Sequence, residues 1–290
     1  MELRVLRYFL AVARTQSISG AAHLLHISQP TLSRQIRELE EELGAALFQR
    51  GNRKITLTNE GMLLRKRAEQ ISDLVQKTED ELAATGDSIS GTIHIGGGET
   101  LAFRPVAKSI RNLVEQYPGI CVRLFSGNAD NVMERLDKGL VDFGLIIEPT
   151  NISKCDYIRL SAVDKWGVLM RKDSPLAELD AVQPEDLYAV PLICPQRILE
   201  YGFLSSWLKV DSTMLHLVAT YNLLFNASLL VEAGVGYALC LDKGIDAASD
   251  MPLCFRPLKP SLESHVYLVW KKDQVFSKIS KLFLKMIRDE

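Results

Sequence analysis

The 290-residue sequence predicts an α/β protein built from three consecutive parts, on three observations. Residues 3–43 contain segments in which apolar residues recur every three or four positions, as they do in helices that pack together. One uninterrupted helical pattern then spans residues 59–84. From residue 91 onward, short apolar strands alternate with helices, which is typical of a parallel sheet covered by helices.

The second and third predicted helices have the order and spacing of a helix-turn-helix, with another helix before them. Leu3, Leu6 and Leu10 mark the first helix by their spacing. A short second helix covers residues 17–25, and its small residues allow another helix to cross closely. Residues 26–28 form the tight turn that leads into a third helix, so the three segments together predict this motif.

The third helix carries side chains that suit the DNA major groove. Ser28 is a good N-cap, and Pro30 fits the first turn, where a missing N–H costs nothing. A stripe of apolar residues is predicted to face inward: Leu32, Ile36, Leu39 and Leu43. The outward residues are Gln, Ser, Thr and Arg, which can bond to bases or phosphates. The predicted DNA contacts are Ser28, Gln29, Pro30, Thr31, Ser33, Arg34 and Arg37. Taken alone, this helix fits an ordinary surface helix with a solvated face equally well.

A small hairpin with a basic tip follows this helix. Gly44 ends the helical pattern, and the strands 47–50 and 54–57 flank the turn 51–53. Arg53 and Lys54 at the tip are expected to attract phosphates without reading sequence.

Residues 1–65 closely resemble the LysR-type transcriptional regulators. The resemblance is carried by Leu6-x-x-Phe9, Ser17-Ile18-Ser19-x-Ala21-Ala22, Ser28-Gln29-Pro30-x-Leu32-Ser33-x-Gln35-Ile36, Leu39-Glu40, Leu43-Gly44, Leu47-Phe48-x-Arg50 and Leu57-Thr58-x-x-Gly61. It implies a winged helix-turn-helix DNA-binding domain (1–58), a dimerising linker helix (59–86) and a C-terminal effector-binding domain (87–290). The last would be two-lobed and similar to periplasmic binding proteins, with lobe I at 91–161 and 267–290 and lobe II at 162–266. The implied function is transcription regulation by a homodimer or homotetramer that binds an imperfect DNA palindrome and a small-molecule effector.

The linker helix has an apolar seam with heptad spacing, over a length of ~40 Å. The seam residues are Leu64, Ala68, Ile71, Val75, Thr78 and Leu82. A helix lying on its own domain would show a similar stripe. Because the family's linker helix pairs antiparallel between subunits, the dimer is favoured. Residues 85–91 are a flexible hinge by composition.

The C-terminal part alternates strands and helices throughout. Strands are predicted at 92–96, 121–125, 141–147, 167–170, 184–187, 192–194, 215–220, 237–241 and 265–270, and helices at 105–117, 129–138, 223–233 and 276–287. The chain would cross between lobes near 161–162 and 265–266, forming a hinge.

Ligands of open α/β sheets bind beyond the carboxyl ends of the strands, which predicts a cleft between the lobes. The predicted effector-binding residues are Glu99, Thr100, Ser126, Asn128, Glu148, Gln196, Arg197 and Asn222. Each of these could equally be an ordinary strand-to-helix cap. Glu99 and Glu148 depart from the Ser/Thr lining of family members that bind small organic acids, and they favour a ligand that carries an amine.

Charge and cysteine content agree with this division. The net charge is −2, but residues 1–67 carry eleven Lys/Arg against six acids, so the positive charge gathers at the DNA-binding end. No apolar run is long enough for a membrane span, and the N-terminus is unlike a signal peptide. Five cysteines without a Cys-x-x-Cys indicate reduced thiols, so a cytoplasmic protein is expected.

Two other classes fit the sequence less well. One is a small-molecule enzyme with an accessory helix-turn-helix, but the glycines at 96–98 lack the last glycine of a dinucleotide-binding loop, where Leu101 stands. No catalytic residue, cofactor or metal is predicted. The other class, a stand-alone solute-binding receptor, would not carry the winged helix. Retention on DNA that falls steeply with salt distinguishes the regulator from both.

Overall fold

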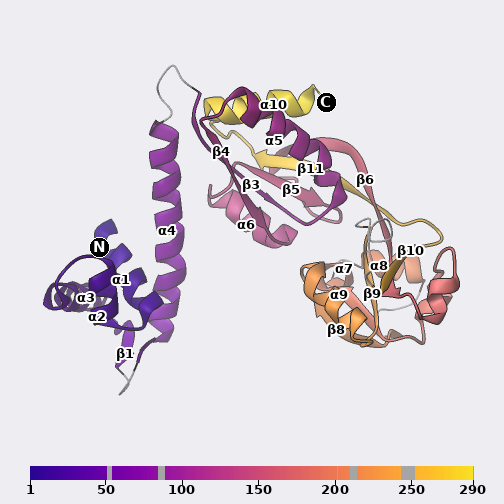
Figure 1. Cartoon of the computed structure of the whole chain (residues 1–290), viewed down its shortest axis with the longest axis horizontal. Helices are drawn as coiled ribbons and strands as arrows, with labels where there is room; N and C mark the ends of the chain where they lie inside the picture. The colour runs from indigo at the N-terminus through magenta and orange to yellow at the C-terminus, as the bar shows by residue number, and fades with distance from the viewer. Residues whose placement is uncertain (51–53, 84–88, 201, 210–213, 243–251, 290) are drawn as a thin grey trace. The chain divides into compact units, whose positions relative to one another are not determined.

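The computed structural model describes residues 1–50, 54–83, 89–200, 202–209, 214–242 and 252–289. The chain divides into two compact units, Met1–Ala83 and Ala84–Glu290. Figure 1 labels most of the helices and strands of both units. Each unit has its own hydrophobic core and is described separately below.

Three helices pack around one core in the first unit. They are α1 (Leu3–Thr15), α2 (Ile18–Leu24) and α3 (Gln29–Leu43). The Ser17 and Ser28 hydroxyls cap α2 and α3, accepting from Gly20 N and Thr31 N. The residues buried in this core include Leu6, Phe9, Val12, Leu32, Ile36 and Leu39. The predicted stripe of α3 is wrong at its last position, because Leu43, the last residue of the helix, is 41% exposed and does not belong to this core.

A two-stranded wing is fixed against these helices by hydrogen bonds. Strands β1 (Phe48–Arg50) and β2 (Ile55–Leu57) pair antiparallel, as the sequence predicts. Glu40 Oε1 accepts from the backbone N–H groups of Leu47 (2.7 Å) and Phe48 (3.2 Å). The predicted turn, with Arg53, lies outside the described residues.

Helix α4 (Asn59–Ala83) is the long helix that the sequence predicts. Leu64 packs on the core of the first unit and Ala68 is fully buried in it, so the seam does not face another subunit at these two positions. The first turns of α4 are needed to close their own domain, which the heptad spacing alone does not reveal. Farther along, Ile71 and Leu74 are 37% and 45% exposed. Residues 85–88 of the predicted hinge (85–91) lie outside the described residues.

One mixed sheet runs through the second unit. Its strands are β3 (Gly91–Gly97), β4 (Ile120–Ser126), β5 (Phe143–Ile147), β6 (Cys155–Arg171), β7 (Leu192–Pro195), β8 (Leu217–Tyr221), β9 (Tyr237–Leu241), β10 (Leu253–Pro257) and β11 (Glu263–Lys271). The order is β4-β3-β5-β11-β6-β9-β7-β8, with β10 also paired to β6. Strand β3 runs parallel to β4 and β5, and β7 runs parallel to β8 and β9. The expectation of a parallel sheet is wrong for β6, β10 and β11, which pair antiparallel with their neighbours.

Helices flank the parallel strands of this sheet. They are α5 (Arg104–Gln116), α6 (Ala129–Asp137), α7 (Gln196–Glu200), α8 (Phe203–Leu208), α9 (Leu224–Glu232) and α10 (Lys278–Arg288). One core gathers around Phe143 and Phe283, and another around Trp166 and Trp207. Residues Pro184–Leu187 form a 3-10 turn instead of the predicted strand, because Gln183 and Asp186 make reciprocal caps that fold the backbone into a turn.

Strands β6 and β11 connect the two ends of the sheet. Their pairing runs from Glu263 opposite Lys165 to His265 opposite Val163, and resumes with Tyr267 opposite Arg159. The irregularity between these stretches falls at the two places where the sequence predicts the chain to cross between lobes.

Candidate functional site

The N-terminal half of α3 presents a polar surface. The side chains of Ser28, Gln29, Pro30, Thr31, Arg34 and Arg37 are exposed, and Ser33 is half-buried. The buried Leu32, Ile36 and Leu39 on the opposite side fix this orientation. The helix thus offers hydroxyl, carboxamide and guanidinium groups from one face.

The Arg34 side chain is only weakly held on this surface. Its Nε lies 3.6 Å from Glu38 Oε1, and the arginine and glutamate side chains are 69% and 53% exposed. An ion pair this exposed contributes ~0.2–1 kcal/mol, so the guanidinium can leave it for a stronger partner. Ser28 and Thr31 instead bond to each other, with 2.7 Å between their hydroxyl oxygens.

Lys54 extends the basic surface from the wing. Its side chain is exposed just before β2, and the Ile55 N–H donates to the Gln16 carbonyl, 3.1 Å away, which fixes the strand to the end of α1. Arg53, the other predicted wing contact, lies outside the described residues.

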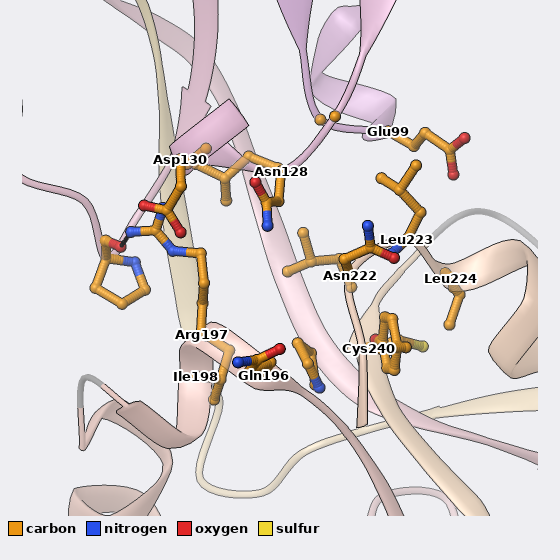
Figure 2. A pocket seen from close by; sticks show the side chains of 18 of the residues that line it. Glu99, Asn128, Asp130, Gln196, Arg197, Ile198, Asn222, Leu223, Leu224 and Cys240 are labelled. Atoms are coloured by element: carbon orange, nitrogen blue, oxygen red, sulfur yellow. Dashed lines mark hydrogen bonds and ion pairs between the residues drawn. The ribbon is translucent and has the colours of Figure 1, made fainter. Parts of the chain in front are cut away.

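A cleft of about 300 Å³ lies in the second unit, at the carboxyl ends of β3, β4, β5, β7 and β8 (Figure 2). Six of the eight predicted effector-binding residues line it: Glu99, Asn128, Glu148, Gln196, Arg197 and Asn222. The strand-end rule therefore brings together residues that are as much as 123 positions apart in the sequence.

Thr100 and Ser126 line a separate cavity of about 390 Å³ with Phe103 and Leu124. The Thr100 hydroxyl donates to the buried Asp164 carboxylate and accepts from Ala102 N at 3.0 Å. The expectation that Thr100 faces the cleft is therefore corrected. Its hydroxyl is used to start the 3-10 turn and to satisfy a carboxylate on β6.

Replacing Thr100 tests this structural role. We expect Thr100→Val to lower the free energy of unfolding by ~1–3 kcal/mol, because the buried Asp164 carboxylate loses a donor. Chemical denaturation of the full chain measures the change. If Thr100→Val left the stability unchanged but abolished the response to effector, Thr100 would be a ligand contact, contrary to this structural role.

Arg197 on α7 bridges to residues from the other end of the sheet. Its Nη1 lies 2.8 Å from Asp130 Oδ1, and its Nη2 donates to the Pro149 carbonyl (3.1 Å) and to Thr150 Oγ1 (3.3 Å). The Arg197 side chain is only 13% exposed. Figure 2 shows the guanidinium beside Asp130. The sequence reasoning missed Asp130, although an acid two residues after Asn128 in the first turn of a helix was a usable signal.

Glu148 is bonded to the strand beside it. Its Oε1 accepts from the Tyr267 hydroxyl at 2.6 Å, and its Oε2 accepts from His265 N at 3.1 Å. Donation to this carboxylate raises the pKa of Tyr267. Because β11 already occupies both oxygens, Glu148 is a weaker partner for a ligand amine than the sequence implied.

Two aromatic residues that the sequence reasoning missed also line the cleft. Trp166 Nε1 donates to Ser264 Oγ at 2.9 Å, and the Tyr221 hydroxyl donates to the Leu239 carbonyl at 2.8 Å. Burial raises the pKa of Tyr221 well above its usual range, so its hydroxyl stays neutral. Both residues therefore line the cleft with their polar atoms already bonded within the protein.

The described part of the chain lacks two further features. No helix there is long and apolar enough to cross a membrane. Nor do three or more His, Cys, Asp or Glu residues gather there in a way that could hold a metal ion.

Comparison with known proteins matches both units. The profile "Bacterial regulatory helix-turn-helix protein, lysR family" matches residues 3–62, and the profile "LysR substrate binding domain" matches residues 86–290. The HTH-type transcriptional regulator YvbU of Bacillus subtilis (strain 168) is 29% identical over 294 residues, covering 100% of this chain and 98% of the relative. BsdA of the same organism, also an HTH-type transcriptional regulator, is 32% identical over 67% of this chain and 66% of its own length.

The crystal structure of CbnR, described as a LysR family transcriptional regulator, has the same fold with a TM-score of 0.78. It is 20% identical and covers 100% of this chain and 99% of its own. The predicted fold class, a helix-turn-helix followed by an α/β substrate-binding domain, is confirmed.

Proposed function

Because this chain belongs to the LysR family of bacterial transcriptional regulators, we propose specific residues for its two binding functions. The protein is a DNA-binding transcription regulator with a C-terminal domain for a small-molecule effector. In our proposal, α3 enters the major groove and reads bases with Gln29, Thr31 and Arg34. Ser28, Ser33 and Arg37 support this contact, and Pro30 shapes the first turn. Lys54 and Arg53 on the wing attract the phosphate backbone.

The DNA-binding assignment rests on α3. The N-terminal half of this helix exposes polar side chains, and its opposite side is buried in the core. Hydroxyl, carboxamide and guanidinium groups can each bond to bases, and an Arg–guanine pair gives ~1–3 kcal/mol of discrimination. Arg34 leaves only a weak surface ion pair to make such a contact.

We expect Arg34→Ala to reduce affinity for the operator by about 5- to 150-fold and to relax preference at one base pair. Lys54→Ala should weaken specific and random DNA alike and reduce the salt slope by about one. Titrations of both variants against operator and scrambled DNA at several salt concentrations measure these effects. If Arg34→Ala lost affinity equally for operator and scrambled DNA, Arg34 would be a phosphate contact and not a base contact.

The cleft is proposed as the effector site, with Glu99, Asn128, Gln196, Arg197 and Asn222 at its wall. Segments 91–161 and 267–290 would form one lobe and 162–266 the other, hinged at the irregularity between β6 and β11. An effector that binds the closed form more tightly shifts the population toward it, and only by that difference in affinity.

We further propose that residues 59–86 hold a dimer through Ile71 and Leu74, and that dimers can pair into tetramers on DNA.

The relatives carry the names of transcriptional regulators, and we assign no catalytic activity to this chain. Since its DNA partner is the chromosome, the proposed location is the cytoplasm.

A further inference from the structure

The polar groups that line the cleft are mostly committed to partners within the protein. The Trp166 indole, the Tyr221 hydroxyl and the Glu148 carboxylate each make the bonds described above. A ligand gains little by competing for such groups, since breaking an internal hydrogen bond in a cleft costs about as much as the new bond returns. The donors that remain therefore decide which ligand chemistry fits.

The guanidinium of Arg197 is also committed. It is the sole basic side chain among the described residues of the cleft wall, and it bonds to Asp130, to the Pro149 carbonyl and to the Thr150 hydroxyl. Such a charge-assisted bond is stronger than one between neutral groups. A ligand carboxylate would have to displace Asp130 to reach this cation.

Asn128 and Asn222 face the cleft with amide donors. Asn128 Oδ1 accepts from Asn131 N at 2.9 Å, and Asn222 Oδ1 accepts from Leu223 N at 2.9 Å. These bonds fix which end of each carboxamide is oxygen, so each Nδ2 group is left to donate. Figure 2 shows both carboxamides among the side chains that line the cleft.

The charge of the lining disfavours an anion. Glu99, Asp130 and Glu148 carry three negative charges against the single positive charge of Arg197. Helices α6 and α9 begin at the cleft, and each adds only about half a positive charge at its N-terminus. The sum remains negative, and an anion transferred there from water finds no cation that is not already paired.

The rest of the wall is apolar. Leu145 and Ile147 come from β5, Leu224 from α9, and Cys240 and Leu241 from β9. Together with Trp166 and Tyr221, they can cover a hydrocarbon body. A cleft of about 300 Å³ lies at the small end of the range for ligand sites and suits a small molecule.

We propose that the effector is an uncharged amphipathic molecule, such as an amide, ester or alcohol, and that the cleft discriminates against carboxylates. An oxygen of the ligand accepts from the carboxamides of Asn128 and Asn222, while its apolar body lies against the aromatic and aliphatic wall. This inference rests on the proposed effector role of the cleft and specifies the chemical class that it takes.

Three probes of similar size test the class on the full chain: benzamide, benzoate and benzylamine. In ligand-observed NMR, the dissociation constant of benzamide should be at least tenfold lower than that of benzoate. Benzoate binding as tightly as benzamide would overturn the proposal, as would failure of benzamide to bind. Tighter binding of benzylamine than of benzamide would assign recognition to the acids instead of the carboxamides, and would also overturn it.

Two variants connect the selectivity to named groups. Asn128→Asp keeps an oxygen to cap α6 but removes the amide donor, so benzamide affinity should fall by about tenfold. Asp130→Asn removes the anion from Arg197, so benzoate affinity should rise at least tenfold while benzamide affinity changes little. Asp137→Asn makes the same charge change on α6 outside the cleft and serves as the control. Unchanged benzoate affinity in Asp130→Asn would contradict the role given to the ion pair.

The same preparations are titrated with operator DNA. Failure of the wild-type chain to bind operator DNA would contradict its proposed function as a transcription regulator. Retained operator binding with a preference for benzoate would contradict only the ligand class.

Discussion

The Ile71→Asp variant is expected to sediment as a monomer and to bind operator DNA at least about a hundredfold more weakly than the wild type. Ile71 and Leu74 are 37% and 45% exposed on α4, whereas Leu64 and Ala68 are covered by their own domain. A carboxylate buried between two such helices costs several kcal/mol, which exceeds the 2.8 kcal/mol that corresponds to a hundredfold change (about 1.4 kcal/mol per tenfold). Analytical ultracentrifugation and operator titration measure the two effects.

Gln76→Asp is the matched control for this substitution. It adds the same charge to α4, and a helix of 3.6 residues per turn places Gln76 about 140° away from Ile71. We expect it to remain dimeric and to bind operator normally. A dimeric Ile71→Asp would show that the exposed part of α4 does not hold the subunits together.

Gly61→Ala is expected to destabilise the DNA-binding unit by about 3 kcal/mol or more. A Cβ at this position would lie 2.0 Å from the Leu47 carbonyl oxygen and 3.0 Å from Leu57 Cδ2. The Leu47 carbonyl also accepts from Thr58 N, so it cannot move without loosening the junction between the wing and α4. Thermal unfolding should show the loss as an earlier transition of this unit.

Gly20→Ala makes the same substitution at another glycine and is expected to stabilise the protein. At Gly20 the nearest atom to a new Cβ is Ser17 Cβ at 3.4 Å, which is an ordinary contact. Alanine stabilises a helix relative to glycine by about 0.5–1 kcal/mol, so α2 should gain stability.

Equal stability of Gly61→Ala and wild type would contradict the close approach of α4 to the wing.

The N-terminal unit was predictable because its signals are local. Ser28 caps α3 where the sequence predicts an N-cap, and Gly44 ends the same helix with a φ of 64°. The extent of the α4 seam was not predictable in the same way. A heptad stripe looks identical whether it faces its own domain, as Ala68 does, or lies open, as Ile71 does.

Long-range pairing explains most of what the sequence did not reveal in the second unit. Strand β6 (Cys155–Arg171) was predicted only at 167–170, because polar residues such as Asp156 and Asp164 interrupt its apolar pattern. Its length is set by pairing with β11, β9 and β10, which lie far away in the sequence. Strand β10 (Leu253–Pro257) was missed for the same reason.

The cleft was partly predictable from the rule that ligands bind at strand ends. That rule found Asn128 and Asn222, but it does not specify which way each side chain turns. Thr100 bonds to Asp164 on β6, and Arg197 bonds to Asp130, so the partners of both residues come from elements that only the fold brings near.

Selection of genomic DNA by the purified protein tests the central claim most directly. Sheared DNA from the genome that encodes the protein would be bound, washed at increasing salt and sequenced, with Arg34→Ala in parallel. The wild type should enrich fragments that share one imperfect palindrome, with half-sites separated by about one helical turn or a multiple of it. The variant should enrich the same fragments less and tolerate a change at one base pair of each half-site. Uniform recovery of fragments by both proteins, with no shared motif, would contradict a sequence-specific regulator.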